Sequence, residues 1–524
     1  MNSEPAEDTI TLCKNSIMTK SVGRFLPWLL GVLLLCLPAQ ASVTVASVFT
    51  DHAVLQQGIR VPVWGKAKPG ERVVVSYAGR TESTLAGADG RWRVSLPPMP
   101  PRLTGSLVVT GDGTNLAFAD VVTGEVWLCS GQSNMNFLMR DANDAQREMA
   151  NATHPEIREF RTREVILDEP DDAGGGKWVP SAPDTAGRFS AVAYFFALEL
   201  SAALQMPLGL LTAANGGTTA EAWTSKTAIA GNAELAVVME RWNEDLKLRP
   251  QRMDAYELSV AEYEKKQAQG VTTGRRPELP RGPGHPHSLG GHFNGMIYPL
   301  IPYAIRGVLW YQGESNAPCP EEYEPLCRTL IQDWRSRWGQ GAFPFILIQL
   351  PRHLRYPEDP TGVAWAFIRE AQTHLLKLEN TGMAITLDLG DTQELHPKNK
   401  REFAERAARV AKALVYKQEL SYSGPLFQKA EYRQQDVRLS FAHASKGLAT
   451  SDGKPPGGFQ AAGRDQSFVE AEARIEGQSV VVSSPKVPQP VAVRYAWSND
   501  PVKANLINKD ALPASPFRTD NWRE

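Results

Sequence analysis

Residues 125–135 read EVWLCSGQSNM. The first six residues form a short, mostly apolar run that is typical of a buried strand, and Gly131 begins a turn. Ser133 therefore follows directly after a strand. In open α/β sheets, the reactive groups collect at the carboxyl ends of the strands, so Ser133 is the first candidate for a nucleophile.

The same rhythm of strand, loop and helix continues from about residue 121 to residue 420. Further strands are predicted at residues 207–213, 305–311, 345–350 and 383–388. Helical patterns lie between or after them, at residues 192–204, 326–338, 364–378 and 401–416. Alternating strands and helices predict an α/β domain with a parallel sheet and helices on both faces.

Three other segments depart from this rhythm. Residues 42–120 and 421–524 contain short apolar stretches between turn signals, which predicts a β domain before the α/β domain and a β region after it. The later β region is expected to pack on the α/β domain, and completion of the earlier sandwich is the alternative. Residues 226–290 contain a charged helical stretch and a Pro/Gly loop, and we interpret them as an insertion.

The first 41 residues have the layout of a secretory signal peptide. Lys20 and Arg24 precede the apolar run 26–37, and the small residues at 39–41 stand at the cleavage spacing. Met18 is an alternative start, and an uncleaved anchor is the rival interpretation. We expect a secreted protein, periplasmic or extracellular, with no membrane segment after cleavage.

The composition and the cysteines indicate which partners, disulfides and cofactors to expect. A net charge of −2 does not suggest a nucleic-acid partner. Cleavage leaves three cysteines, of which Cys129 is expected to be a buried thiol, while Cys319 and Cys327 are close enough in sequence for a disulfide. His285 and His287 lie in a loop, so no metal site is predicted, and no cofactor is expected. The oligomeric state is not predicted.

Polar groups stand at the ends of four predicted strands. After the first comes Ser133, and after the second comes NGGT at residues 215–218. The third is followed by QGESN at residues 312–316, and the fifth by DLGD at residues 388–391 and then by His396. A hydroxyl, glycine amides, a carboxamide and an imidazole therefore meet at one edge of the sheet.

These groups are the ones that acyl transfer needs. A serine hydroxyl becomes a nucleophile when a base takes its proton, and His396 is the natural base. The tetrahedral intermediate carries an oxyanion that requires fixed donors. The backbone N–H groups of Ser133 and Gly217 and the carboxamide of Asn316 are candidates for this oxyanion hole.

The motifs around these residues closely resemble those of sialate O-acetylesterases, a family of SGNH (GDSL-like) serine hydrolases. The resemblance covers nearly the whole mature chain. It is carried by residues 131–135 (GQSNM), 310–316 (WYQGESN), 396–397 (HP), 49–56 (FTDHAVLQ), 293–297 (FNGMI) and 513–520 (PASPFRTD). It implies a three-layer α/β/α catalytic domain flanked by sandwich-like β regions, Ser133 as nucleophile, His396 as base, and Gly217 and Asn316 in the oxyanion hole.

One position departs from the pattern of these hydrolases. Many of them carry an aspartate three residues before the histidine, where this chain has Gln393. We expect Asp391 to be the acid that orients His396. Asp388, Glu394 or a backbone carbonyl are the alternatives.

The resemblance also implies the substrate. We expect an acetylated carbohydrate, 9-O-acetylated sialic acid by analogy with the family, and Gln132, Gln312 and Glu314 as residues that bind it. Glu314 has bracing of its loop as an alternative role. An esterase for acetylated xylan or another polysaccharide is the nearest rival, and a non-catalytic glycan-binding protein is a rival of another class.

Overall fold

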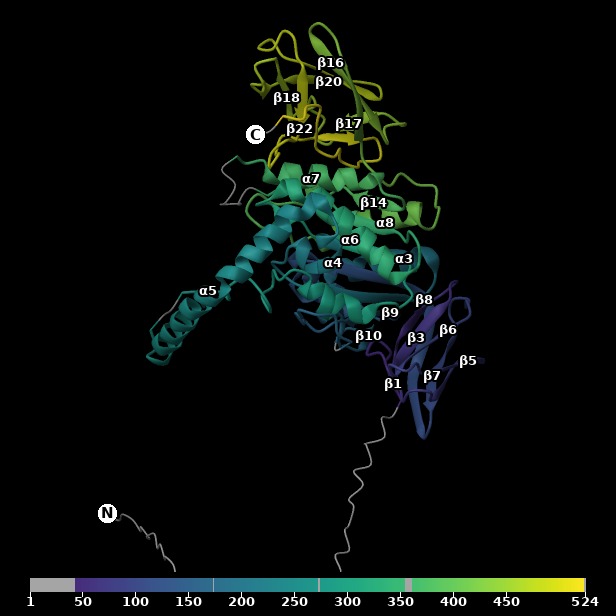
Figure 1. Cartoon of the computed structure of the whole chain (residues 1–524). Helices are drawn as coiled ribbons and strands as arrows, with labels where there is room; N and C mark the ends of the chain where they lie inside the picture. Colours follow the sequence, from purple (N-terminus) through teal and green to yellow (C-terminus); the bar gives the residue numbers. More distant parts are fainter. Residues whose placement is uncertain (1–42, 173, 272–273, 354–360, 523–524) are drawn as a thin grey trace, which may run out of the picture. The chain divides into compact units, whose positions relative to one another are not determined.

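The computed structural model describes residues 43–172, 174–271, 274–353 and 361–522 (Figure 1). The predicted signal peptide, residues 1–41, lies outside the described residues. Among the helices of the described part, none is long and apolar enough to cross a membrane.

A mixed sheet forms the centre of the fold. Its strands are β8 (Thr114–Gly131), β9 (His154–Arg161), β10 (Trp178–Ser181), β11 (Leu208–Ala214), β12 (Gly307–Tyr311), β13 (Phe345–Ile348) and β14 (Thr381–Ala384). They lie in the order β10-β9-β11-β8-β12-β13-β14. All neighbouring pairs from β9 to β14 are parallel, and β10 is antiparallel to β9. The predicted mixture of parallel strands and helices is confirmed.

The burial of the central strands explains why their sequences are so apolar. Every residue of β11, β12, β13 and β14 is buried. Strands covered on both faces read as continuous apolar runs, which is how the sequence revealed them. The prediction missed β9, because its sequence HPEIREFR is charged and contains a proline.

The helices pack in pairs along this sheet. They are α1 (Ser133–Asn136), α2 (Ala145–Ala150), α3 (Ala191–Leu204), α4 (Lys226–Ala230), α5 (Ala236–Ala268), α6 (Tyr323–Trp338), α7 (Ala364–His374) and α8 (Lys400–Leu414). Helix α3 packs against α8, and α6 packs against α7. Local signals set their ends: Ser190 caps α3 by accepting a hydrogen bond from the backbone N–H of Ala193, and Gly339 ends α6 at φ +67°.

The N-terminal β region shares a strand with the central sheet. Its strands are β1 (Thr44–Val45), β2 (Val54–Gln56), β3 (Val61–Lys66), β4 (Arg72–Tyr77), β5 (Arg80–Leu85), β6 (Arg91–Leu96) and β7 (Thr104–Gly111). The first part of β8 pairs with β7, and its last part pairs with β11 and β12. The expected domain boundary at residue 120 therefore falls inside a continuous strand.

The strands after residue 420 pair only with one another in the described residues. They are β15 (Leu426–Tyr432), β16 (Asp436–Ala442), β17 (Leu448–Thr450), β18 (Phe459–Ala462), β19 (Val469–Glu470), β20 (Glu472–Glu476), β21 (Ser479–Ser483), β22 (Ala492–Tyr495), β23 (Leu506–Asn508) and β24 (Phe517–Arg518). They enclose a second hydrophobic cluster, to which Leu387 of the α/β part also contributes. The alternative in which they complete the N-terminal sheets is therefore wrong.

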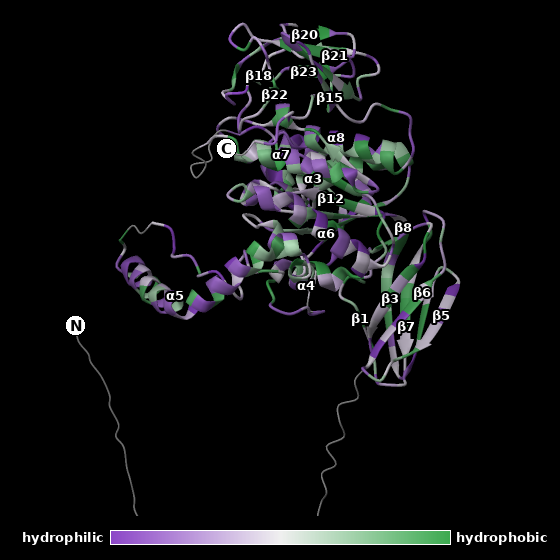
Figure 2. Cartoon of the chain, turned by 45° about the horizontal axis from the view of Figure 1, so that its top comes forward, coloured by the Kyte–Doolittle hydropathy of each residue, from purple (hydrophilic) through white to green (hydrophobic). Residues whose placement is uncertain are grey.

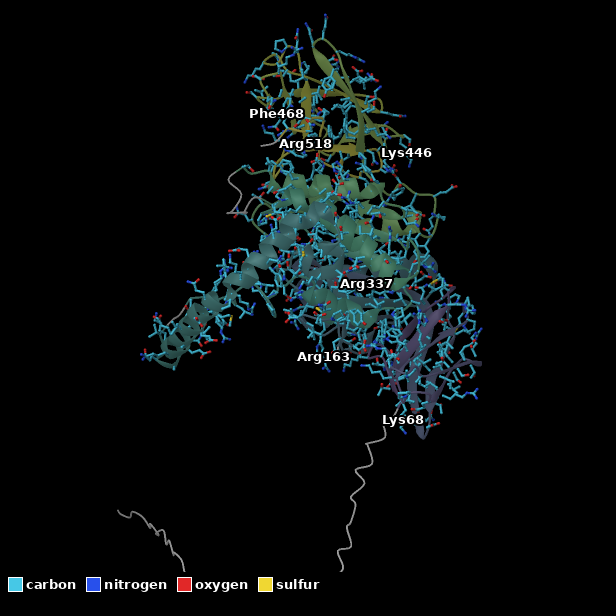
Figure 3. The ribbon with its side chains drawn as sticks, viewed as in Figure 1. Lys68, Arg163, Arg337, Lys446, Phe468 and Arg518 are labelled. Atoms are coloured by element: carbon cyan, nitrogen blue, oxygen red, sulfur yellow. The ribbon has the colours of Figure 1, made fainter. Side chains whose placement is uncertain are left out.

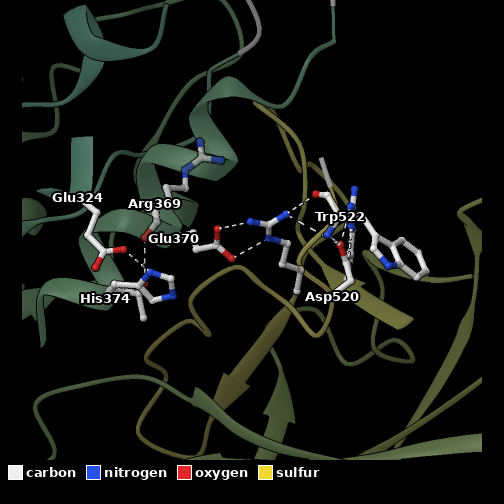
Figure 4. Close-up of polar contacts among 9 residues, drawn as sticks. Glu324, Arg369, Glu370, His374, Asp520 and Trp522 are labelled. Atoms are coloured by element: carbon white, nitrogen blue, oxygen red, sulfur yellow. Dashed lines mark hydrogen bonds and ion pairs between the residues drawn. The ribbon is translucent and has the colours of Figure 1, made fainter. Parts of the chain in front are cut away.

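The C-terminal β region is joined to α7 by a half-buried ion pair between Arg518 and Glu370. Figure 3 locates Arg518 in this region, and its guanidinium donates to both carboxylate oxygens of Glu370 at 2.9 Å. Arg494 pairs in turn with the buried Asp520 at 2.9 Å. Figure 4 shows Glu370 on α7 facing this cluster. The expected packing of the C-terminal region on the α/β part is thus seen in specific contacts.

The insertion is built mainly by α5, a helix of 33 residues. Only Val238 and Trp242 of α5 are buried, and both lie in its first two turns. Figure 2 shows most of the helix as hydrophilic, in agreement with the charged pattern in the sequence. After α5 the chain returns through the Pro/Gly loop to Leu289, which is buried.

The three cysteines of the described residues do not form a disulfide. Cys129, Cys319 and Cys327 are all free thiols. Cys327 is buried in α6, and Cys319 lies near the guanidinium of Arg241, with 3.8 Å between Sγ and Nη1. The possible Cys319–Cys327 bond is therefore not present.

A buried carboxylate ties β8 to the elements around it. Glu125 is fully buried and accepts hydrogen bonds from Gln57 (2.5 Å), Tyr416 (2.8 Å) and the Arg306 guanidinium (2.5 and 2.9 Å). Gln57 belongs to the N-terminal region, and Tyr416 follows α8. One side chain thus holds three separate segments at the start of the parallel part of the sheet.

Glu125→Ala is expected to lower the free energy of unfolding by about 3 kcal/mol, because it leaves the Arg306 guanidinium without its partner. Urea unfolding monitored by tryptophan fluorescence measures this loss. Glu431→Ala, which removes an exposed carboxylate paired with Lys429, is the matched control and should leave the unfolding midpoint unchanged. Equal midpoints for the two variants would contradict the role given to Glu125.

Candidate active site

Ser133 and His396 meet at the carboxyl edge of the sheet. Ser133 is the first residue of α1, directly after β8, and His396 lies in the loop that leads from β14 to α8. His396 Nε2 lies 2.8 Å from Ser133 Oγ, which is hydrogen-bond distance. Both side chains are partly exposed. This geometry lets the imidazole take the hydroxyl proton while a reactant approaches from solvent.

The protonation state of His396 suits a general base. Burial lowers the pKa of His396 below its ordinary value of 6.5, the Lys400 ammonium adds to this effect, and the Glu394 carboxylate opposes it. The imidazole is therefore neutral at pH 7 and free to accept a proton at Nε2.

The acid predicted to orient His396 lies elsewhere. Asp391 is exposed, and its Oδ1 accepts hydrogen bonds from the backbone N–H groups of Gln393 (2.7 Å) and Glu394 (3.0 Å). The Asp391 carboxylate therefore stabilises a turn, and this geometry corrects the expectation that it contacts the imidazole. Asp388 is also engaged, in a two-point ion pair with Arg406.

Among the carboxylates of the described residues, Glu394 is the one that approaches the imidazole. Its Oε1 lies 3.9 Å from His396 Nδ1 and accepts the backbone N–H of His396 at 3.0 Å. A separation of 3.9 Å is too long for a hydrogen bond, so the interaction is an electrostatic one between partly exposed groups.

The three groups predicted to form the oxyanion hole keep donors that are not used within the described part of the protein. No acceptor in the described residues takes the backbone N–H of Ser133 or of Gly217. The Asn316 carboxamide is held in one orientation: Oδ1 accepts from Ala220 N–H (2.9 Å) and Gln312 (2.7 Å), while Nδ2 donates to Glu221 at 2.8 Å. The second hydrogen of Nδ2 remains for a ligand. A Cβ built on Gly216 would lie 3.5 Å from Ser133 Cβ, so the loop that carries Gly217 lies beside Ser133, and Asn316 is bonded to Ala220 just after that loop.

The three residues predicted to bind the substrate are buried instead. Gln132, Gln312 and Glu314 are 2%, 0% and 4% exposed. Gln132 Oε1 accepts from Gln312 Nε2 (3.2 Å) and from the backbone N–H of Ser315 (3.2 Å). These side chains join the loop after β8 to the loop after β12, so we correct their role from binding to positioning. The alternative given for Glu314, bracing of its loop, agrees with this.

A buried polar network below Ser133 was not predicted. Asn134 Nδ2 donates to Glu314 Oε1 at 2.6 Å and to the carbonyl of Leu395 at 3.2 Å, and Lys400 Nζ donates to Asn134 Oδ1 at 2.6 Å. Burial raises the pKa of Glu314 and lowers the pKa of Lys400 to about 7. The network links the serine loop to the residue before His396. Nothing in the local sequence of Lys400 signals this role.

Two hollows are lined by residues of the candidate site. One of about 610 Å³ lies beside His396 and is lined by Phe137, Arg140, Asp141, Ala142, Asn143, Asp144, Glu394 and Lys398. The second hollow, of about 280 Å³, is lined by Asn316, by Trp242 of α5, and by Arg281 and His287 of the loop after α5. The insertion therefore reaches the edge of the site.

Comparisons with known proteins agree on one class. The family described as carbohydrate esterase, sialic acid-specific acetylesterase, matches residues 297–415. The sialate O-acetylesterases of Mus musculus and Homo sapiens are each 28% identical to this chain, over 90% of it and over 93% and 91% of their own lengths. The crystal structure of a carbohydrate acetylesterase from Xanthomonas citri is 34% identical, with a TM-score of 0.78, and the match covers 92% of this chain and all of that one.

The rate at which Ser133 reacts with a fluorophosphonate reagent is expected to rise with pH, with a midpoint below 6.5. The sign follows from the lowered pKa: His396 accepts the serine proton only when it is neutral, which is the case above that pKa. Stopped-time labelling read by intact-mass spectrometry measures the rate, with Ser133→Ala as the unlabelled control. A midpoint above 6.5 would contradict this account of His396.

Proposed function

Because the chain belongs to the sialate O-acetylesterase family of carbohydrate esterases, we propose that it removes O-acetyl groups from sugars through an acetyl-Ser133 intermediate. The chain is a carboxylic ester hydrolase. The observation that carries the mechanism is the 2.8 Å contact between His396 Nε2 and Ser133 Oγ.

The reaction runs in two half-reactions. Ser133 Oγ attacks the acetyl carbonyl carbon as its proton passes to His396 Nε2, and the oxyanion is held by Ser133 N–H, Gly217 N–H and Asn316 Nδ2. The bond from the carbonyl carbon to the sugar oxygen then breaks, and His396 returns the proton to that oxygen. A water molecule next attacks the acetyl-serine, His396 takes its proton, and acetate leaves as the proton returns to Ser133 Oγ.

The position of the sugar follows from this proton transfer. The leaving oxygen has to lie within hydrogen-bond reach of His396 Nε2. The hollow beside His396 is the adjoining space, and its polar lining, with Arg140, Asn143 and Lys398, suits a hydroxyl-rich ring. We therefore assign this hollow to the sugar.

Two substrates have separate support. The curated relatives named sialate O-acetylesterase favour O-acetylated sialic acid, with the 9-O-acetyl form expected. The more similar relative from Xanthomonas citri is described only as a carbohydrate acetylesterase, which favours an acetylated polysaccharide such as xylan as the second candidate. A non-catalytic glycan-binding protein would not need the hydrogen-bond contact between Ser133 and His396, so this contact argues against that alternative.

The proposal also covers the type of catalytic domain, the flanking domains and the export of the protein. The parallel order of β9, β11, β8, β12, β13 and β14, with the serine loop after β8, supports an SGNH-type three-layer α/β/α catalytic domain. The separate antiparallel sheets of the flanking regions support sandwich-like domains. We also propose export through the leader at residues 1–41, to the periplasm or the outside.

Ser133→Ala is expected to lower acetate release by roughly 10⁴-fold or more, because it removes the nucleophile. Acetate is measured with 9-O-acetylated sialic acid, acetylated xylan and an aryl acetate. The urea midpoint should match that of the wild type, since Ser133 Oγ bonds only His396 in the described residues. Retained activity in this variant would contradict the assignment of Ser133 as nucleophile. If the wild type releases acetate from xylan and not from sialic acid, the acetylated polysaccharide becomes the proposed substrate.

Glu394→Gln is expected to lower kcat about fivefold, because a carboxylate about 4 Å from the imidazolium contributes about 1 kcal/mol in a solvated site. Asp391→Asn is the matched control. Its new amide oxygen can still accept from Gln393 and Glu394, so kcat should change less than twofold. A larger loss in Asp391→Asn than in Glu394→Gln would restore Asp391 as the orienting acid.

A further inference from the structure

The loop at residues 215–218, which carries Gly217, is held firmly at both ends. Asn215 Nδ2 donates to Glu164 Oε1 at 2.6 Å. Thr218 Oγ1 donates to the carbonyl of Asn215 at 2.8 Å and accepts from Trp223 Nε1 at 2.9 Å. Asn215 and Thr218 are buried. The two glycines between them are exposed and have no side chains to anchor them.

One side chain of the insertion reaches these glycines. His287 Nε2 lies 2.6 Å from the carbonyl oxygen of Gly217. Because a carbonyl oxygen only accepts, Nε2 carries the proton and donates it. No other side chain in the described residues bonds to Gly216 or Gly217. His287 comes from the Pro/Gly loop after α5, far from the loop in sequence.

The conformation of Gly217 explains why an external contact is needed. Gly217 has a φ of +69°, and a Cβ placed on it would meet nothing within 4 Å. Neither strain nor packing limits its backbone, and glycine is the residue with the most backbone freedom to lose. The bond from His287 to the Gly217 carbonyl restrains the Gly217–Thr218 peptide directly. Since Asn215 anchors the other end of the loop, it also limits how far the Gly216–Gly217 peptide, which carries the Gly217 N–H, can turn.

The chemistry of His287 fits a fixed donor and no proton transfer. Burial lowers the pKa of His287, and burial lowers the pKa of His285 to about 4. His285 Nδ1 accepts the backbone N–H of His287 at 2.9 Å, which fixes the turn. A neutral imidazole with its Nε2 proton committed to Gly217 holds one orientation.

We propose that His287 is a positioning residue of the oxyanion hole: it holds the Gly217 carbonyl and so limits how far the Gly217 N–H can turn away from the developing oxyanion, which makes the insertion part of the active site. This inference rests on the proposed function, since it assumes the esterase role of Gly217. Preorganised donors stabilise the transition state because they do not have to reorient as charge develops.

The test compares His287→Leu with His287→Gln on an aryl acetate. Removing a whole donor costs about 10²–10³ in kcat. Loosening one should cost less, so His287→Leu is expected to lower kcat about 10–100-fold with KM nearly unchanged. Gln can still donate to Gly217 and should recover kcat to within about threefold of the wild type. Rates are counted per serine titrated with fluorophosphonate, which removes misfolded protein from the comparison.

His154→Leu is the matched control. The ring of His154 has no hydrogen-bond partner in the described residues, so its loss should leave kcat unchanged. If Ser133→Ala is inactive while His287→Leu keeps kcat within twofold of the wild type, the inference fails and the proposed function stands. Activity retained in Ser133→Ala would instead remove the proposed function.

Hydrogen exchange gives a readout that does not require turnover. The backbone N–H of Asn215 donates to the carbonyl of Gly131 at 3.2 Å. In His287→Leu, this amide is expected to exchange at least about tenfold faster, because the loop at residues 215–218 opens more often, and His287→Gln should restore its protection. The amides of residues 208–213 are the internal reference, because β11 is buried in the sheet. Unchanged exchange at Asn215 would overturn the positioning role.

Discussion

The active site depends on how closely the ends of β8 and β12 approach each other. Gly131 has a φ of +141°, and a Cβ there would lie 2.0 Å from the carbonyl oxygen of Tyr311, so only glycine fits. This approach buries Gln132 and Gln312 side by side. Gln312 then donates to Asn316 Oδ1 at 2.7 Å, which fixes the orientation of the Asn316 amide group. The Ser133 loop and the Asn316 carboxamide, the proposed nucleophile loop and oxyanion donor, are therefore positioned by one contact between two strands.

A buried network of polar side chains lies next to the Ser133 loop. Lys400 is fully buried, and its ammonium lies 4.7 Å from the ring centroid of Phe137 and 2.6 Å from Asn134 Oδ1. Asn134 passes the connection on to Glu314. Such networks are costly when one member is missing, because the remaining groups stay buried without partners. Their contribution is geometric: the serine loop and the loop before His396 are fixed to each other through α8.

The sequence predicted the groups at the strand ends well, and their surroundings poorly. Ser133, Gly217, Asn316 and His396 follow apolar runs, and the topology of a parallel sheet brings such positions to one edge. Whether a polar side chain at that edge faces solvent or the interior is decided by packing across strands. That is why Gln132 was expected at the surface and is buried. The contact of His287 joins segments 70 residues apart through a loop without periodicity, so no local pattern predicts it.

The relative weights of the catalytic groups follow from these distances. Glu394, at 3.9 Å from Nδ1 and partly exposed, contributes about 1 kcal/mol. A single oxyanion donor is worth about 2.7–4 kcal/mol. In the proposed mechanism, the three donors therefore stabilise the transition state more than an acid behind His396 does, which is consistent with the absence of aspartate at Gln393. An enzyme that relies on its donors has to keep them rigid, and the exposed Gly217 is the donor with the least support from its own chain.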